Sequence, residues 1–147
     1  MSPAFDGLLK IDLYSPALLA LTLLCAAVLI QNFLTGPLAF LKEEQAPGMP
    51  LRGDHTQLSF RVLRTYSNSV ESLPTFGFAV LLAILVGVAP APVNWLAGIH
   101  VAFRLAFWAV YYSGIGKVAG GPRTLCFVGG SLTNLVLVVI TLRALVG

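Results

Sequence analysis

Long apolar stretches separated by short polar segments make up most of this chain. The apolar stretches cover about residues 15–41, 59–88, 92–116 and 122–146. Each reaches or exceeds the roughly 20 residues that an α-helix needs to cross the hydrocarbon core of a bilayer. The pattern therefore predicts an all-α integral membrane protein, a bundle of four transmembrane helices that forms one domain over residues 1–147.

Proline and glycine mark where these helices are expected to begin and end. Pro16, Pro92 and Pro122 stand at expected helix starts, because the first turn of a helix leaves its N–H groups without intrahelical partners and so tolerates proline. The expected connections are a polar loop over residues 42–56, a tight hairpin at 89–91 and a glycine-rich turn over 116–121.

Composition supports the membrane assignment. Hydrophobic residues make up 57% of the chain and charged residues 10%, and the mean hydropathy is +0.87. A soluble domain of this length needs far more charge on its surface, so that class is excluded. The first apolar stretch is longer than the apolar core of a signal peptide and lacks a small-residue cleavage site, so we expect it to remain a helix.

Basic residues gather at one end of the predicted bundle. By the positive-inside rule, the first and third loops then face the cytoplasm and both termini lie on the opposite side, and the compact loops favour a bacterial inner membrane. The net charge of +3 fits this topology and contact with anionic lipid, and it gives no support for nucleic-acid binding. The basic residues concerned are Lys42, Arg52, Arg61, Arg64, Lys117 and Arg123.

The cysteines and histidines show no metal-binding spacing. His55 and His100 are far apart in the chain, and Cys25 and Cys126 fall in different predicted helices. Zinc sites need closely spaced pairs of ligands. We therefore expect no metal site and interpret both cysteines as small apolar residues.

Polar residues on the second predicted helix are the first indication of function. Arg61, Arg64, Asn68 and Glu71 are three, four and three residues apart. At about 100° per residue they fall within a sector of about 80°, so they share one face of the helix. An ionised Glu facing lipid costs several kcal/mol, which predicts that this face points into the bundle or a subunit interface.

The third predicted helix supplies a candidate partner for Glu71. Arg104 lies near the middle of this apolar stretch, with Trp108 and Tyr111 on the same face. If the second and third helices run antiparallel, Arg104 and Glu71 lie within about 10 Å in depth, so we predict an ion pair between them. This pair has two interpretations: it marks a functional site, or it only locks the two helices together.

The fourth predicted helix begins with residues suited to an anion. Arg123 and Thr124 lie in its first turn, where free backbone N–H groups and the helix dipole favour negative charge. An arginine that holds lipid headgroups is the alternative interpretation. Together with Tyr111 and the polar face of the second helix, these residues predict a cytoplasmic-end pocket for a small charged molecule, beside a lipid-facing cleft for an apolar one.

These features resemble the MAPEG superfamily, the membrane-associated proteins in eicosanoid and glutathione metabolism. The chain length, the four helices and the polar first loop agree with that family, so the resemblance covers nearly the whole chain. Within the family, the chain resembles the prokaryotic-type members. The residues that carry the resemblance are Arg64-x-x-x-Asn68-x-x-Glu71, Pro74, Arg104, Tyr111 and Arg123.

The resemblance implies a homotrimer that binds glutathione as co-substrate between neighbouring subunits, near the cytoplasmic side. In such a protein, Arg64, Asn68 and Glu71 would hold the charged and amide groups of glutathione. Tyr111 would add a hydroxyl contact. The implied partners are therefore further copies of the chain, membrane lipid, glutathione and a small hydrophobic substrate.

The resemblance also implies the chemistry. Arg123, with Thr124 beside it, would stabilise the glutathione sulfur as a thiolate, because an adjacent guanidinium favours the nucleophilic anion. The thiolate would attack an apolar electrophile, or reduce a lipid hydroperoxide, that arrives from the bilayer. The implied function is a membrane-bound glutathione-dependent transferase or peroxidase.

Two other function classes stay open on the sequence alone. Ser67 and Ala39 stand where basic ligands of glutathione are expected, and Phe107 stands where a histidine often occurs in this family. A trimeric membrane protein that binds a lipid or small hydrophobic ligand without catalysis fits these differences. A small transporter or channel subunit, in which the intramembrane arginine and glutamate line a path, is the third class.

Overall fold

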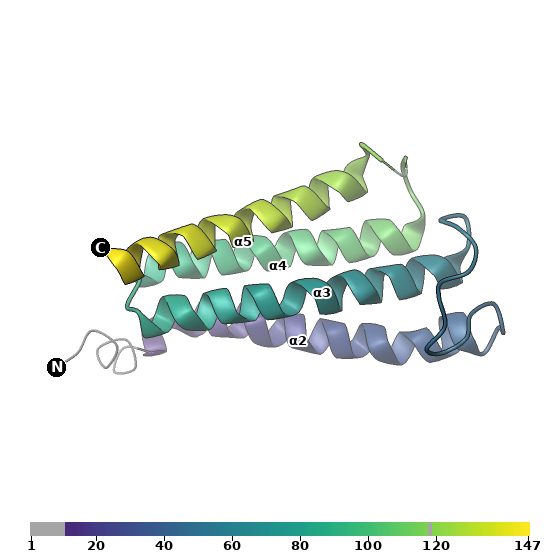
Figure 1. Cartoon of the computed structure of the whole chain (residues 1–147), viewed down its shortest axis with the longest axis horizontal. Coiled ribbons are helices and arrows are strands. Elements are labelled where there is room, and N and C mark those ends of the chain that lie inside the picture. Colours follow the sequence, from purple (N-terminus) through teal and green to yellow (C-terminus); the bar gives the residue numbers. More distant parts are fainter. Residues whose placement is uncertain (1–10, 118) are drawn as a thin grey trace.

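The computed structural model describes residues 11–117 and 119–147, and all regular structure within these ranges is helical. Within these ranges four helices are long and apolar enough to cross a membrane, and Figure 1 shows them lying side by side. The predicted all-α, four-span fold is therefore confirmed, and the protein is a multi-pass membrane protein. The helices are α2 (Ser15–Thr35), α3 (Leu58–Leu85), α4 (Pro90–Ser113) and α5 (Pro122–Val146), with a 3₁₀ turn η1 (Ile11–Tyr14) before α2 and a π-helical turn η2 (Gly36–Phe40) after it.

The helix ends follow the prolines and glycines, but α4 ends at Ser113, just before Gly114, and not at the predicted residue 116. α2, α4 and α5 each have proline in the first turn, as expected. α3, however, ends at Leu85 and does not continue to the predicted residue 88. The cause is Gly87, which takes a left-handed conformation (φ 76°) so that the Val88 N–H bonds back to the Ala83 carbonyl (2.9 Å). The hairpin therefore lies earlier than predicted, and Pro90 already belongs to α4.

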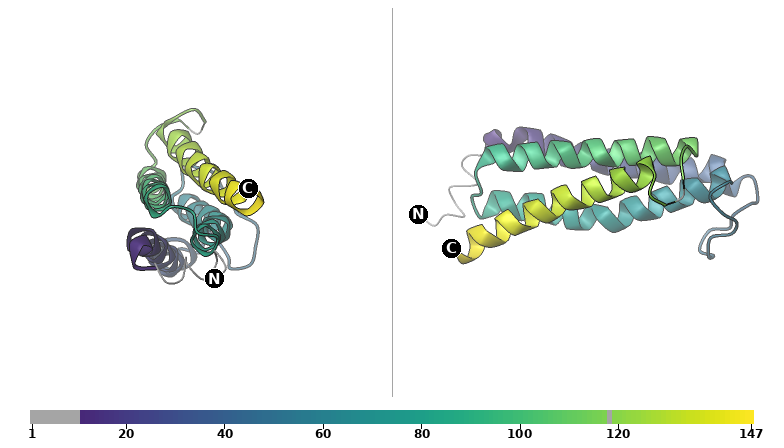
Figure 2. Two further views of the ribbon diagram at one scale, coloured as in Figure 1. Left: turned by 90° about the vertical axis from the view of Figure 1, so that its left-hand side faces the viewer. Right: turned by 90° about the horizontal axis from the view of Figure 1, so that it is seen from above.

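α3 and α4 form the centre of the bundle, and each packs against both outer helices, α2 and α5. Figure 2 shows the bundle end on, with α2 and α5 on opposite sides of the central pair and α5 inclined to the other helices. The loop between η2 and α3 and the loop between α4 and α5 lie at the same end of the bundle (Figure 1). We call this end the loop end.

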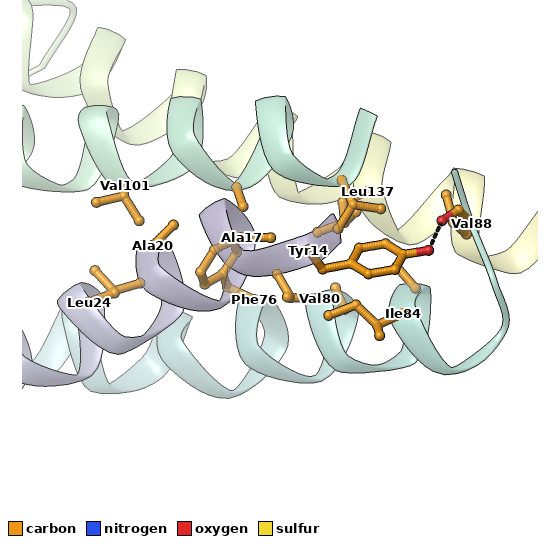
Figure 3. Close-up of a cluster of buried hydrophobic side chains, with 14 residues drawn as sticks. Tyr14, Ala17, Ala20, Leu24, Phe76, Val80, Ile84, Val88, Val101 and Leu137 are labelled. Atoms are coloured by element: carbon orange, nitrogen blue, oxygen red, sulfur yellow. Dashed lines mark hydrogen bonds between the residues drawn. The ribbon is translucent and has the colours of Figure 1, made fainter. Parts of the chain in front are cut away.

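The apolar core lies in the half of the bundle away from the loop end. Figure 3 shows Phe76 and Val80 of α3 packed with Ala17 of α2, and all three side chains are completely buried. Tyr14 closes this half of the bundle, because its hydroxyl donates a hydrogen bond to the Val88 carbonyl. Polar side chains gather at the loop end instead, so the core and the candidate site occupy opposite parts of the same helices.

Large apolar side chains cover the outside of the bundle. Leu29, Phe33 and Leu132 are each at least half exposed. A bilayer accepts such a surface, because acyl chains replace water around it while the helices satisfy their own backbone groups. Cys25 and Cys126 are both free cysteines.

Candidate functional site

Most of the predicted site residues line one cleft at the loop end, which we call the polar cleft. Its volume is about 310 Å³, and its walls come from the first loop, α3, α4 and α5. Every predicted ligand except Glu71 takes part. The lining residues are His55, Arg64, Asn68, Phe107, Tyr111, Arg123, Thr124 and Phe127.

Arg123 and Tyr111 meet in the polar cleft. Arg123 lies in the first turn of α5, and Tyr111 is buried in the last turn of α4. The guanidinium carbon lies 4.7 Å from the centroid of the Tyr111 ring, a cation–π contact. This contact places a permanent cation and a phenolic hydroxyl on one wall of the cleft.

His55 of the first loop contacts both of these groups through one nitrogen. Its Nδ1 lies 3.1 Å from Arg123 Nη1 and 3.0 Å from the Tyr111 hydroxyl oxygen. A guanidinium can only donate, so Nδ1 is unprotonated and accepts, and the Tyr111 hydroxyl donates to the same lone pair. His55 is therefore a neutral imidazole with its proton on Nε2.

The surroundings of His55 keep it neutral. Burial lowers the pKa of His55 below its ordinary value of 6.5, and the positive charges of Arg123, Arg64 and Arg61 lower it further, while Asp54 acts in the opposite direction. The imidazole is therefore uncharged at pH 7. The positive charge of the polar cleft comes from Arg64 and Arg123.

Arg61 fixes the loop that carries His55. Its Nη1 donates to the backbone carbonyls of His55 (2.9 Å) and Thr56 (2.8 Å), and its Nη2 donates to the Tyr112 carbonyl (3.4 Å) at the end of α4. The Arg61 side chain therefore joins the first loop, α3 and α4. A second hollow of about 300 Å³ adjoins the polar cleft here and shares His55, Tyr111 and Arg123 with it.

Asn68, Arg64 and Thr124 complete the polar wall. Asn68 Oδ1 is buried and has no hydrogen-bond partner within the described ranges, so it is an unused acceptor. Arg64 is exposed in the cleft. The Thr124 hydroxyl accepts the Gly120 N–H (3.1 Å), so it also orders the turn before α5.

The predicted ion pair between Glu71 and Arg104, two residues that the structure describes, is not formed within the chain. Arg104 is buried and donates to the Ser69 hydroxyl (3.3 Å), whereas Glu71 is exposed. Ser69 and Glu71 are two residues apart, about 200° around the helix, so they point in nearly opposite directions. The prediction was wrong because α3 presents Ser69 to α4.

A groove between α3 and α5 leads from the polar cleft along the membrane span. Its first part, about 390 Å³, shares Phe127 with the polar cleft and reaches the buried Arg104 and His100 of α4. Its second part, about 250 Å³, shares Thr75 and Val138 with the first and is almost entirely apolar. We call the two parts the membrane groove, which is lined by residues between Ser72 and Leu82 on α3 and between Phe127 and Leu145 on α5.

The family comparison agrees with this geometry. A sequence model of the MAPEG family matches residues 14–143, nearly the whole chain. The chain belongs to the MAPEG family. It is therefore a membrane protein of the MAPEG superfamily of eicosanoid and glutathione metabolism, as the resemblance implied. Neither a curated protein nor a solved structure matches the chain significantly.

Sequence reasoning missed His55 as a site residue of this MAPEG protein. It was interpreted as an isolated histidine because the other histidine, His100, is far away in the chain. Its partners Tyr111 and Arg123 follow 56 and 68 residues later. The available signal for His55 was its position in a loop at the same end of the predicted bundle as Arg123. Phe127, which separates the polar cleft from the membrane groove, had no signal beyond its apolar character.

Proposed function

We propose that the protein is a membrane-bound glutathione-dependent transferase or peroxidase that acts on small hydrophobic electrophiles or lipid hydroperoxides. One observation carries the proposal: Arg123 and Tyr111 share a cleft with Arg64 and Asn68, beside a groove along the membrane span. Arg123 and Tyr111 suit a thiolate, and Arg64 and Asn68 suit the charged and amide groups of a tripeptide. Membership of the MAPEG family supports glutathione as the co-substrate.

Arg123 supports the thiol chemistry. A free thiol has a pKa of about 8.5 and is mostly protonated at neutral pH, and a nearby guanidinium favours the nucleophilic thiolate. Tyr111 adds a hydroxyl donor next to the guanidinium. Thr124 lies in the same first turn of α5, whose unpaired N–H groups also favour an anion. These residues would hold the sulfur in its reactive form.

Arg64 and Asn68 suit the remainder of glutathione, which carries two carboxylates and one ammonium group at neutral pH. Arg64 would pair with a carboxylate through its planar guanidinium. The unused Asn68 Oδ1 would accept an amide N–H. Within the described residues no acidic side chain lines the polar cleft, so the ammonium group needs an acceptor from elsewhere.

Glu71 supports an assembly that supplies this acceptor. It is exposed on a membrane-spanning helix, where an ionised carboxylate facing lipid costs several kcal/mol. We infer that this side of α3 faces a neighbouring copy of the chain and that Glu71 of one subunit meets the glutathione held by the next. The family resemblance gives the count of three subunits.

The assembly is tested by native mass spectrometry of the purified protein in detergent, and we expect three chains. Glu71→Gln keeps the size of the side chain, so it should remain a trimer but bind glutathione about tenfold more weakly, because one charge-assisted hydrogen bond is weakened. Glu44→Gln, an exposed position of the first loop, is the matched control. A monomer, or unchanged glutathione affinity in Glu71→Gln, would contradict this assignment.

The glutathione site is tested by titration, with the ultraviolet absorbance of the thiolate as the signal. We expect saturable binding in the native protein and a Kd about 10-fold or more higher in Arg64→Ala, because an arginine–carboxylate pair is lost. Arg52→Ala removes the same charge from an exposed loop position outside the cleft and should bind normally. No saturable signal at millimolar glutathione would leave the fold unchanged and exclude the glutathione mechanism.

The location of the polar cleft fits the proposed topology. The first and third loops carry the basic residues and would face the cytoplasm, in a bacterial inner membrane, with the termini on the opposite side. Glutathione would then enter from cytoplasmic water. The apolar substrate would enter along the membrane groove and pass Phe127.

A second candidate function is the binding of a lipid or small hydrophobic ligand without catalysis. It is favoured by the far part of the membrane groove, whose walls are almost entirely apolar. A fluorescent apolar probe would distinguish the two functions. Saturable binding of the probe by a protein that forms neither a thiolate nor a conjugate with glutathione would establish the second function in place of the first.

A further inference from the structure

One lone pair of His55 accepts from two donors in the polar cleft. Arg123 Nη1 and the Tyr111 hydroxyl lie 3.1 and 3.0 Å from Nδ1. A single imidazole lone pair cannot align well with two donors, so neither bond has its best geometry. An acceptor atom that entered between these donors would take both of their hydrogen bonds, and Nδ1 would then face that atom with its lone pair unused.

We propose that His55 is the base that takes the proton from the thiol bound in the polar cleft. This role rests on the proposed function, because it requires a thiol at Arg123. In the step, the S–H bond breaks, the proton binds to the lone pair of His55 Nδ1, and the sulfur keeps the electron pair. Arg123 and Tyr111, released from Nδ1, donate their hydrogen bonds to the resulting thiolate.

His55 also returns the proton. When the sulfur adds to an electrophilic carbon, an S–C bond forms and an electron pair moves to another atom of the electrophile. That atom takes the proton from Nδ1, and the neutral imidazole is restored. The addition therefore needs no proton, oxidant or reductant from outside the site.

The first loop holds His55 in the orientation that this role needs. Arg61 binds the carbonyl of His55 itself, so the backbone is fixed at that residue. The ring packs edge-on against Phe60, with 4.9 Å between centroids, and lies tilted against the Tyr111 ring at 5.6 Å. These contacts direct Nδ1 towards Arg123 and Tyr111 and leave little freedom for the ring to turn away.

The charges that face His55 suit a base that works only when the thiol is bound. Asp54 lies on its own loop, Arg61 and Arg64 on α3, Tyr111 on α4 and Arg123 on α5. The three arginines oppose a positive imidazole until a thiolate lies beside it. As the pH falls through the pKa of His55, which lies below its ordinary value of 6.5, the ring gains a proton before the thiol binds, so we expect thiolate formation to decline in acid.

The test measures proton release in a weakly buffered solution when glutathione binds to the purified protein, together with the thiolate absorbance. With His55 as the base, the native protein forms the thiolate at pH 7 and releases almost no proton. In His55→Gln the amide oxygen still accepts hydrogen bonds but takes no proton, so each thiolate formed is expected to release about one proton to the solvent. The conjugation rate at pH 7 should fall about 100-fold.

Met49→Ala, at an exposed position of the same loop, is the control and should match the native protein in both measurements. Release of about one proton per thiolate by the native protein would overturn the role of His55 but leave the proposed function intact. An unchanged rate and unchanged proton release in His55→Gln would do the same. The native-protein measurement decides the matter even if the variant folds poorly. Absence of any thiolate signal in the native protein would overturn both proposals.

Discussion

Replacement of Arg123 by leucine is expected to abolish the thiolate signal of bound glutathione and to lower the conjugation rate about 100- to 1,000-fold. Arg123 contacts both Tyr111 and His55, and under the proposed function its guanidinium would lie beside the developing charge of the sulfur. Leucine fills part of the same space but offers neither charge nor N–H donors. Titration with glutathione measures the thiolate, and a conjugation assay with an apolar electrophile measures the rate.

Arg143→Leu is the matched control for this change. Arg143 lies in the last turn of the same helix and is exposed, far from the polar cleft. The same substitution there should leave the thiolate signal unchanged. Arg123→Lys should give an intermediate result, because it keeps the charge but loses the planar fork of donors. A full thiolate signal in Arg123→Leu would show that another group stabilises the sulfur.

Phe76→Ala is expected to destabilise the folded protein by about 3–5 kcal/mol. Phe76 is completely buried in the apolar core and stacks on the His100 ring, with 4.1 Å between centroids and 11° between planes. Alanine leaves a cavity and removes the stacking partner of a buried imidazole. Unfolding by denaturing detergent in mixed micelles, followed by circular dichroism, measures the free energy.

Phe78→Ala tests whether this loss comes from the core. Phe78 lies on the same helix, two residues away, and its side chain is 66% exposed. Truncation there removes contacts with detergent or lipid and should cost less than about 1 kcal/mol. Equal losses of unfolding free energy in both variants would mean that the loss in Phe76→Ala does not come from the apolar core.

The sequence determined the parts of the structure that depend on neighbouring residues. The bilayer sets helix length, and proline and glycine limit helix ends, so four spans were predicted from local pattern and were confirmed. Arg64 and Asn68 are four residues apart and so share a face in any helix, and both line the polar cleft. Pro122 begins α5, so Arg123, the next residue, lies in the first turn of that helix.

The tertiary structure decided which helix faces meet. Glu71 shares a sector with Arg64 and Asn68, but it lies at the edge farthest from Ser69, the side of α3 that α4 contacts. A spacing along one helix fixes relative directions and not the direction of the neighbour. This is why the Glu71–Arg104 pair was predicted and is absent between these two described residues.

His55 is the clearest case of a position that only the tertiary structure decided. The loop that carries His55 shows no helical or strand periodicity in the sequence. The conformation of this loop depends on Arg61 of α3 and the Tyr112 carbonyl of α4. His55 Nδ1 meets the side chains of Tyr111 on α4 and Arg123 on α5. Local sequence determines helices because their hydrogen bonds close within a few residues, whereas a loop side chain is positioned by contacts distant in the chain.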